Sequence, residues 1–279
     1  MAHIVSPEAE KLLDKEIKVL DRGFVRLVDY LGSDARIVQA ARVSYGPGTK
    51  TLREDKVLID YLLRHQHTSP FEQVVITLHA KMPIFVARQW VRHRTARLNE
   101  ISGRYSEMKD EFYLPETGRV QPQDTVNRQG SSEDRDVPAE VREKAIELIK
   151  RDQGNAYASY REMLDDGISR ELARINLPLN LFTEWYWQID LSNMFRFLKL
   201  RMDWHAQWEI RQYADTLAMI VKAVAPMAYE AFEEHILYGA NFSRSEINAL
   251  HQMLDGKPCP LKGLLLVEFN KKMGFDKQT

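Results

Sequence analysis

Arginines dominate the segment RQWVRHRTARLNEISGR, which runs from Arg88 to Arg104 and carries the clearest chemistry in the chain. It holds five arginines, one acid and no lysine, whereas an exposed helix face usually mixes Lys with Arg and matches both with Glu. A guanidinium binds phosphate or carboxylate oxygens two at a time, which a lysine ammonium cannot do. The segment therefore predicts an anion site that takes phosphorylated ligands.

The spacing of residues inside this segment indicates that several of them can bind one phosphate together. If residues 83–92 form a helix, Arg88 and Arg92 lie on one face of it. Ser102 and Gly103 then offer a hydroxyl and backbone N–H groups that a phosphate can approach closely. The alternative is a surface patch of ion pairs, but a single acid in the segment is too few to neutralise five arginines.

Two further clusters of residues each allow a functional and a purely structural interpretation. The turn HTSPFE, residues 67–72, could line a pocket with its His, hydroxyls and carboxylate, or it could be a connector in which Thr68 or Ser69 caps a short helix and Glu72 completes a capping box. Arg201 lies one helical turn before His205 among apolar residues. A partly buried guanidinium there could stabilise a developing anion, or could pair with Asp203 or Glu209.

Taken together, the motifs resemble the flavin-dependent thymidylate synthases. That family's signature is RHR, seven residues and a Ser, and this chain has Arg92-His93-Arg94 followed by Ser102. The likeness continues, in the family's order, through AARVSYG (40–46), HTSPFE, NEISGRYS (99–106), ARINLP (173–178) and HAQWEIRQYA (205–214).

The resemblance implies roles for particular residues. The positions implied to contact FAD are Ser69, Arg92, His93, Arg94, Glu100, Asp190, Leu191, Ser192, Arg196 and His205. The positions implied to bind dUMP are Gln89, Trp90, Val91, Arg92, Glu100, Ile101, Ser102, Gly103, Arg104, Arg174 and Arg201. Arg201 falls where the family places the arginine that favours ionisation of uracil N3. The chain departs from common family residues at Arg97, Asp190 and Arg196.

The implied activity is the reductive methylation of dUMP to dTMP. In the family, 5,10-methylenetetrahydrofolate donates the one-carbon unit, and FAD reduced by NADPH supplies the hydride, so the protein contributes positioning and electrostatics. No enzyme nucleophile is used, which agrees with a single cysteine, Cys259, outside every matched segment. The resemblance also implies a homotetramer with sites shared between subunits.

Composition limits the other classes of function. The chain has 279 residues, a net charge of -1 and 44% hydrophobic residues, which is ordinary globular composition. The first residues are not those of a signal peptide and no apolar run reaches a membrane span, so we expect a cytoplasmic protein without membrane contact. Near-neutral charge disfavours an RNA- or single-strand-binding module, although arginines interleaved with aromatics could serve one.

A metal hydrolase that uses His65, His67, His79 or His93 is the third alternative, and His65 and His67 are a possible ligand pair for it. The chain has no zinc motif of known spacing and no acid–His cluster around this pair, so we predict no metal site. The usual nucleotide motifs are also absent, because YGPGTKT (45–51) lacks the phosphate-loop spacing.

The elements that position these residues predict an α+β fold, a single domain with a small, mostly antiparallel sheet and several long helices. Strands are expected at 23–32, 72–82 and 182–190. Helices are expected at 34–42, 53–65, 83–92, 138–165, 191–202, 205–224 and 226–237, with a short one before Pro178 and two after Asn241. Residues 108–137 are expected to be an irregular lid or interface arm. Residues 1–240 would form the synthase domain and 241–279 a helical extension of it.

Overall fold

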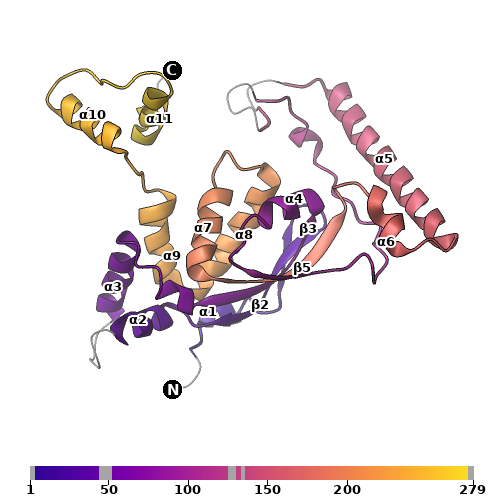
Figure 1. Cartoon of the computed structure of the whole chain (residues 1–279), viewed down its shortest axis with the longest axis horizontal. Coiled ribbons are helices and arrows are strands. Elements are labelled where there is room, and N and C mark those ends of the chain that lie inside the picture. Colours follow the sequence, from indigo (N-terminus) through magenta and orange to yellow (C-terminus); the bar gives the residue numbers. More distant parts are fainter. Residues whose placement is uncertain (1–3, 44–51, 125–129, 133–135, 276–279) are drawn as a thin grey trace. The chain divides into compact units, whose positions relative to one another are not determined.

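The computed structural model describes residues 4–43, 52–124, 130–132 and 136–275, and it has the predicted α+β fold (Figure 1). Its sheet has five strands in the order β1-β2-β3-β5-β4, and every neighbouring pair is antiparallel. The strands are β1 (Glu16–Val19), β2 (Gly23–Leu31), β3 (Val75–Pro83), β4 (Arg97–Glu100) and β5 (Phe182–Asp190). The three strands predicted from the sequence are confirmed, and β1 and β4 were missed.

The two faces of the sheet differ in polarity. On β3 and β5 the side chains of one face, such as Leu78 and Trp187, are fully buried. On the other face His79 stacks on Tyr186 with ring centroids 4.8 Å apart, and the Arg26 guanidinium lies 3.0 Å from His79 Nδ1. Alternation along each strand therefore separates an apolar core face from a polar face.

Helices pack against the apolar face. The helix α7 (Leu191–Arg201) follows β5 directly and packs on it, while α8 (Trp208–Val224) packs on β1, β2 and α7 (Figure 1). The short helix α4 (Ile84–Trp90) contacts β3, β5 and α8. Both ends of α7 matter for the site, because the helix starts at the end of a core strand and ends at Arg201.

The described residues also form eight other α-helices. They are α1 (Pro7–Glu10), α2 (Asp34–Arg42), α3 (Leu52–Arg64), α5 (Ala139–Asp165), α6 (Arg170–Ala173), α9 (Pro226–Phe232), α10 (Arg244–Leu254) and α11 (Leu264–Met273), with single turns at Phe71–Gln73, Thr117–Arg119, Arg174–Asn176 and a π-helical turn at Glu233–Leu237. The chain divides into two compact units, residues 1–230 and 231–279. Within the second unit, Lys272 Nζ donates to Glu246 Oε1 at 2.7 Å.

Three predicted boundaries were wrong. The helix expected over 83–92 ends at Trp90, because the chain turns there to pair as β4 along β5, so Arg92 and His93 lie in the turn. The strand expected from residue 72 begins at Val75, because Phe71–Gln73 forms a 3-10 turn. The helix expected from residue 205 begins at Trp208.

The capping box predicted for the HTSPFE turn does not form. The 3-10 turn has Pro70 at its N-cap without a side-chain hydrogen bond, and Thr68 Oγ1 instead donates to the Glu72 carboxylate at 3.4 Å. YGPGTKT and the end of AARVSYG lie outside the described residues.

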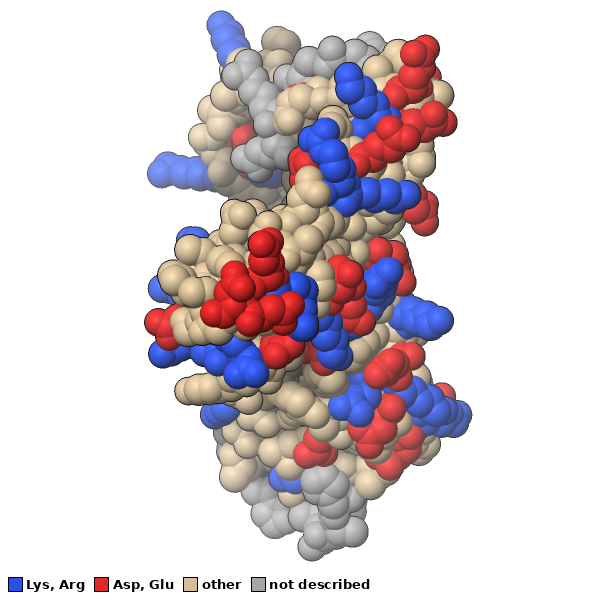
Figure 2. All heavy atoms as spheres, turned by 90° about the vertical axis from the view of Figure 1, so that its right-hand side faces the viewer, with Lys and Arg blue, Asp and Glu red and all other residues tan. Residues whose placement is uncertain are grey.

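The surface drawn in Figure 2 carries charges of both signs. Blue and red side chains alternate there in small groups, and no continuous basic stripe crosses this face. Every helix in the described part of the chain is too short or too polar to cross a bilayer.

Candidate functional site

Arg201, the last residue of α7, is half-buried against the turn that carries the RHR signature. Its Nε donates to His93 Nε2 at 3.0 Å, and its Nη2 donates to the carbonyl oxygen of Gln89 at 3.1 Å. The predicted alternative partners are engaged elsewhere: Asp203 accepts from the backbone N–H of His205, and Glu209 accepts from Tyr113. The structure therefore joins two motifs that lie more than a hundred residues apart in the sequence.

His93 is neutral near pH 7, chiefly because its ring is buried. Burial and, second, the positive charge of Arg201 together lower the pKa of the ring from 6.5 to about 4. Because Nε2 accepts a hydrogen bond from Arg201, the ring proton is assigned to Nδ1. The ring also packs edge-on against Phe197, with centroids 4.7 Å apart.

We expect His93 to titrate near pH 4 rather than near its ordinary value of 6.5. Between these two pH values the unfolded chain binds the proton and the folded chain does not, so the free energy of unfolding should fall as the pH drops from about 6.5 to about 4. NMR of the His93 ring across this range measures the pKa, and His251 provides an exposed reference ring. A His93 midpoint at or above 6.5 would contradict the assignment.

Gln89, which the resemblance places at dUMP, is also fixed through its side chain. Its Nε2 donates to the side-chain oxygen of Gln207. Gln207 lies in the HAQWEIRQYA motif, but the sequence predicted no role for it. Pairing between two distant amides has no signature in a single sequence.

Three predicted ligand contacts have side chains in the core. Trp90 is fully buried and meets Trp185 and Trp187 edge to face, with ring centroids 5.5 and 5.2 Å apart. Leu191 and Ser192, at the start of α7, are also buried. A ligand contact at these three positions would have to use the backbone or follow a change in conformation.

A second group forms around Gly103. A Cβ built at this glycine would lie 3.0 Å from Arg174 Cδ and 2.9 Å from Met108 Sδ, so Arg174 packs directly over the loop. Ser102 Oγ accepts from the backbone N–H of Arg104 at 3.3 Å, and Arg104 Nη2 pairs with Glu171 at 2.6 Å. The structure thus brings together four residues predicted to bind dUMP.

The other arginines of the cluster are largely without acidic partners. Arg88, Arg92 and Arg94 are exposed, and no hydrogen bond or ion pair to any of them occurs within the part of the chain that the structure describes. Arg97 donates to the amide oxygen of Gln188 at 3.4 Å. The alternative of a neutralised ion-pair patch is therefore wrong for most of the cluster, because only Arg104 pairs with an acid among the described residues.

Ser69 lines a cavity of about 420 Å³. The other lining residues include Arg36 and Gln39 from α2, Ala40, and Gln73 from the 3-10 turn. Arg36 can supply a guanidinium to an anionic ligand here. Arg36 and Gln39 were not predicted from the sequence, because a polar residue of a short helix that lines a cavity cannot be told there from an ordinary solvated one.

His205 lines a separate cavity of about 580 Å³ together with Gln207, Trp208 and Arg119. Its Nδ1 lies 2.7 Å from Asp203 Oδ1, and its ring packs on Trp204 with centroids 3.6 Å apart. The Arg119 guanidinium lies over the Trp208 ring at 4.6 Å. The predicted irregular segment 108–137 thus contributes a wall to this cavity.

The remaining predicted positions have structural partners or lie at the surface. Asp190 caps α7 by accepting from the backbone N–H of Asn193 at 2.9 Å, and its second oxygen accepts from the Asn193 side chain. Glu100 accepts from Thr183 Oγ1 at 2.6 Å. Arg196, Val91 and Ile101 are exposed.

The histidine pair proposed as metal ligands has no third partner. The rings of His65 and His67 lie 6.3 Å apart, and the described residues contain no group of three or more side chains placed to hold a metal ion. The structure therefore offers the metal-hydrolase alternative no support.

Comparison with known proteins matches this set of motifs. The family model described as thymidylate synthase complementing protein matches residues 26–227. A flavin-dependent thymidylate synthase of Treponema denticola is 58% identical over 267 residues, covering 96% of this chain and all of the relative. One of Thermus thermophilus is 59% identical over 238 residues, covering 85% of this chain and 86% of the relative.

Solved structures agree with the sequence relatives. A UMP/dUMP methylase PolB of Streptomyces cacaoi, bound with 5-Br dUMP, superposes with a TM-score of 0.70 at 31% identity, covering 79% of this chain and 99% of that chain. Sequence and fold therefore place the chain in the thymidylate synthase complementing protein family, the flavin-dependent thymidylate synthases.

Proposed function

We propose that the chain catalyses the reductive methylation of dUMP to dTMP, with 5,10-methylenetetrahydrofolate as one-carbon donor and FAD, reduced by NADPH, as hydride source. The observation that carries this proposal is the 58% identity, across 96% of the chain, with a relative named as a flavin-dependent thymidylate synthase. Support for the nucleotide comes from the related methylase solved with 5-Br dUMP.

The residues at hand fit a flavin dinucleotide. The cavity at Ser69 carries the Arg36 guanidinium, and Arg92 and Arg94 are exposed cations suited to the phosphates. His93 is neutral, so it can orient a ligand through Nδ1–H without adding charge. When bound, the reduced flavin supplies the hydride.

The groups around Gly103 and Arg201 fit dUMP. Ser102, Arg104 and Arg174 offer a hydroxyl and two guanidinia to the phosphate, and Gly103 allows its backbone to approach closely. Arg201 is a fixed, half-buried cation that can stabilise negative charge at the uracil ring. Its Nη1 has no hydrogen-bond partner among the described residues and is free for this role.

We also propose the homotetramer with sites shared between subunits. In the single chain, the Gln89–Gln207 hydrogen bond joins the group around Arg201 to the cavity at His205. The group around Gly103 and the cavity at Ser69 are separate, and no hydrogen bond or ion pair between described residues links either of them to another group. Assembly of copies would complete each site from several groups. Residues 1–240 would carry the activity and residues 241–279 would form an extension of the same domain.

Replacing Cys259 with Ala should leave the turnover rate within about twofold of the parent. Cys259 lies in the second unit, and the proposed chemistry needs no enzyme nucleophile. Steady-state assay of dTMP formation measures the effect, with circular dichroism as the check of folding. A folded but inactive Cys259→Ala protein would contradict the nucleophile-free mechanism.

The visible absorption spectrum of the purified protein tests the proposal. We expect flavin bands that bleach on anaerobic addition of NADPH, at a rate that dUMP changes, followed by dTMP formation when the folate is supplied. A protein that stays colourless after incubation with FAD would contradict the proposal. Titration of single-stranded RNA across salt concentrations would then test whether the arginine cluster binds polynucleotides instead.

A further inference from the structure

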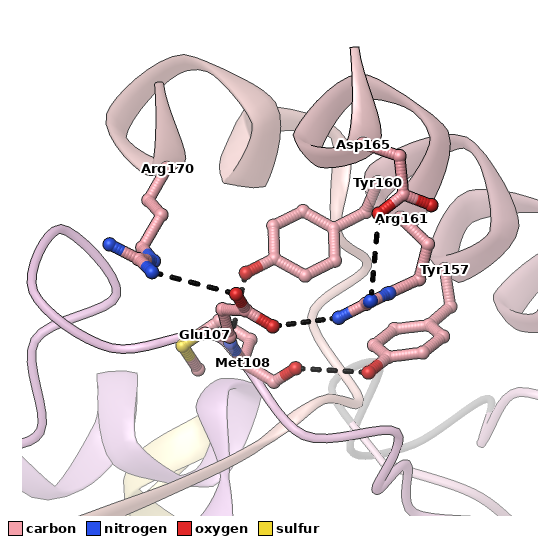
Figure 3. A network of polar contacts seen from close by, with 7 residues as sticks. All are labelled: Glu107, Met108, Tyr157, Tyr160, Arg161, Asp165 and Arg170. Atoms are coloured by element: carbon pink, nitrogen blue, oxygen red, sulfur yellow. Dashed lines mark hydrogen bonds and ion pairs between the residues drawn. The ribbon is translucent and has the colours of Figure 1, made fainter. Parts of the chain in front are cut away.

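The loop that carries Ser102, Gly103 and Arg104 continues into Glu107 and Met108, which are fastened to α5 and α6. Figure 3 shows this network from close by. The Glu107 carboxylate accepts from Arg161 of α5 at 2.7 Å and lies 3.5 Å from Nη2 of Arg170, the first residue of α6. One carboxylate thus joins the loop to two helices.

Two tyrosines of α5 hold the backbone of Met108 at both of its polar groups. The Met108 N–H donates to the hydroxyl of Tyr160 at 2.9 Å, and the Tyr157 hydroxyl donates to the Met108 carbonyl at 3.1 Å (Figure 3). Tyr160 is fully buried, so its hydroxyl is a fixed anchor. Burial raises the pKa of Tyr157, which keeps its hydroxyl protonated and able to donate.

Residues of α6 and the residue that follows it also contact the loop that carries Ser102, Gly103 and Arg104. Met108 Sδ and Arg174 both approach the face of Gly103, and Arg174 follows α6 directly. Glu171, within α6, pairs with Arg104. A shift of the Glu107–Met108 segment would therefore move Gly103 relative to the Arg174 guanidinium.

We propose that Glu107, together with Tyr157 and Tyr160, is a positioning residue that sets the Ser102–Arg104 loop for the nucleotide phosphate. It does not touch the substrate itself. The inference rests on the proposed function, because it specifies how that function's dUMP site is held.

A purely structural role predicts a different outcome from a positioning role. The side chains of Glu107, Arg161 and Arg170 are each nearly half exposed, and exposed ion pairs contribute little to global stability. The effect of removing Glu107 should therefore appear in the binding of dUMP rather than in unfolding. Tyr157 and Tyr160 would still hold the loop near its present position, so dUMP binding should be weakened but not abolished.

The test is Glu107→Ala in the full-length, FAD-loaded protein. We expect the KM for dUMP to rise roughly 10-fold with kcat within about twofold, because a displaced loop weakens the grip on the phosphate. Glu107→Gln, which keeps the shape and one acceptor, should fall between Glu107→Ala and the parent. The melting temperature, flavin spectrum and NADPH oxidation without dUMP should stay at parental values.

Glu147→Ala is the matched control, because Glu147 is an exposed acid of α5, the helix to which Glu107 is bound, and has no hydrogen bond or ion pair to the described residues. It should leave the KM unchanged. A Glu107→Ala protein with parental KM, or with a reduced kcat at parental KM, would overturn the inference. If Glu107→Ala fails to fold, Tyr157→Phe replaces it, and a parental KM in that variant overturns the inference equally.

Failure of the proposed function would look different. In that case the parent protein itself would show neither flavin bands nor any effect of dUMP on NADPH oxidation. Failure of the positioning role would leave the parent active and would leave the KM for dUMP of the Glu107→Ala protein at the parental value.

Discussion

Replacing Arg201 with Lys should lower the rate of dTMP formation about 100-fold or more while the protein keeps its flavin. The lysine retains the positive charge, but it cannot reproduce the planar fork that donates to His93 Nε2 and to the Gln89 carbonyl at once. Without that fork the cation loses its fixed position beside the proposed uracil site. Stabilisation of developing charge depends on such prior placement.

Steady-state and single-turnover assays measure this effect, and the visible spectrum reports flavin content. Arg151→Lys is the matched control, because Arg151 is an exposed arginine of α5 that pairs only with Asp152 among the described residues. The control should turn over at the parental rate. An Arg201→Lys protein as fast as the parent would show that charge alone suffices and that the fork has no catalytic role.

The hydrophobic pattern of the sequence predicted the core of the fold. β5 was predicted over its full length, because residues 182–190 are aromatic and β-prone, and in the structure they alternate between buried and less buried positions. β4 was missed because all four of its residues are exposed, and an edge strand with one apolar residue, Leu98, carries no apolar period. The same hidden strand explains the wrong helix boundary at Trp90, since the chain must leave the helix early to reach β5.

Candidate site residues could be predicted from the sequence where their motifs are local, and could not where their contacts depend on packing. The RHR signature and the Ser102-Gly103 loop are visible in the sequence, but the hydrogen bond from Arg201 to His93 arises only when α7 lies beside the turn. Gln207 and Arg36 are similar cases, because their roles come from neighbours on distant segments. Burial also separates core residues from ligand contacts. Trp90 lies inside the segment predicted to bind dUMP, but its side chain is fully buried in the core.

The two ends of α7 show how one helix serves both stability and function. Asp190 caps its first turn by accepting from Asn193, which leaves less of this carboxylate available for a ligand. At the other end, burial lowers the pKa of Arg201, yet an arginine remains charged at neutral pH. Because β5 runs directly into this helix, the position of the cation is set by the best-packed part of the sheet.

Replacing Gly103 with Ala should reduce kcat/KM for dUMP about 100-fold, mainly through KM, while the flavin stays bound. The new Cβ would lie 2.9 Å from Met108 Sδ, closer than real contacts allow, and 3.0 Å from Arg174 Cδ, which is tighter than most real contacts. Both neighbours belong to flexible side chains, so the fold can yield by moving them. The displaced Arg174 guanidinium would no longer reach the phosphate from its present position.

Gly154→Ala is the control for this change, because a Cβ at Gly154 would meet nothing within 4 Å. Gly154 lies inside α5, where alanine is a better helix former than glycine. The free energy of unfolding of this variant should therefore be about 0.5–1 kcal/mol higher than that of the parent, and its KM should be unchanged. Thermal unfolding and dUMP titration of both variants separate stability from binding. A Gly103→Ala protein with parental affinity for dUMP would place the phosphate away from this loop, and the search for its site would move to the unpaired Arg88, Arg92 and Arg94.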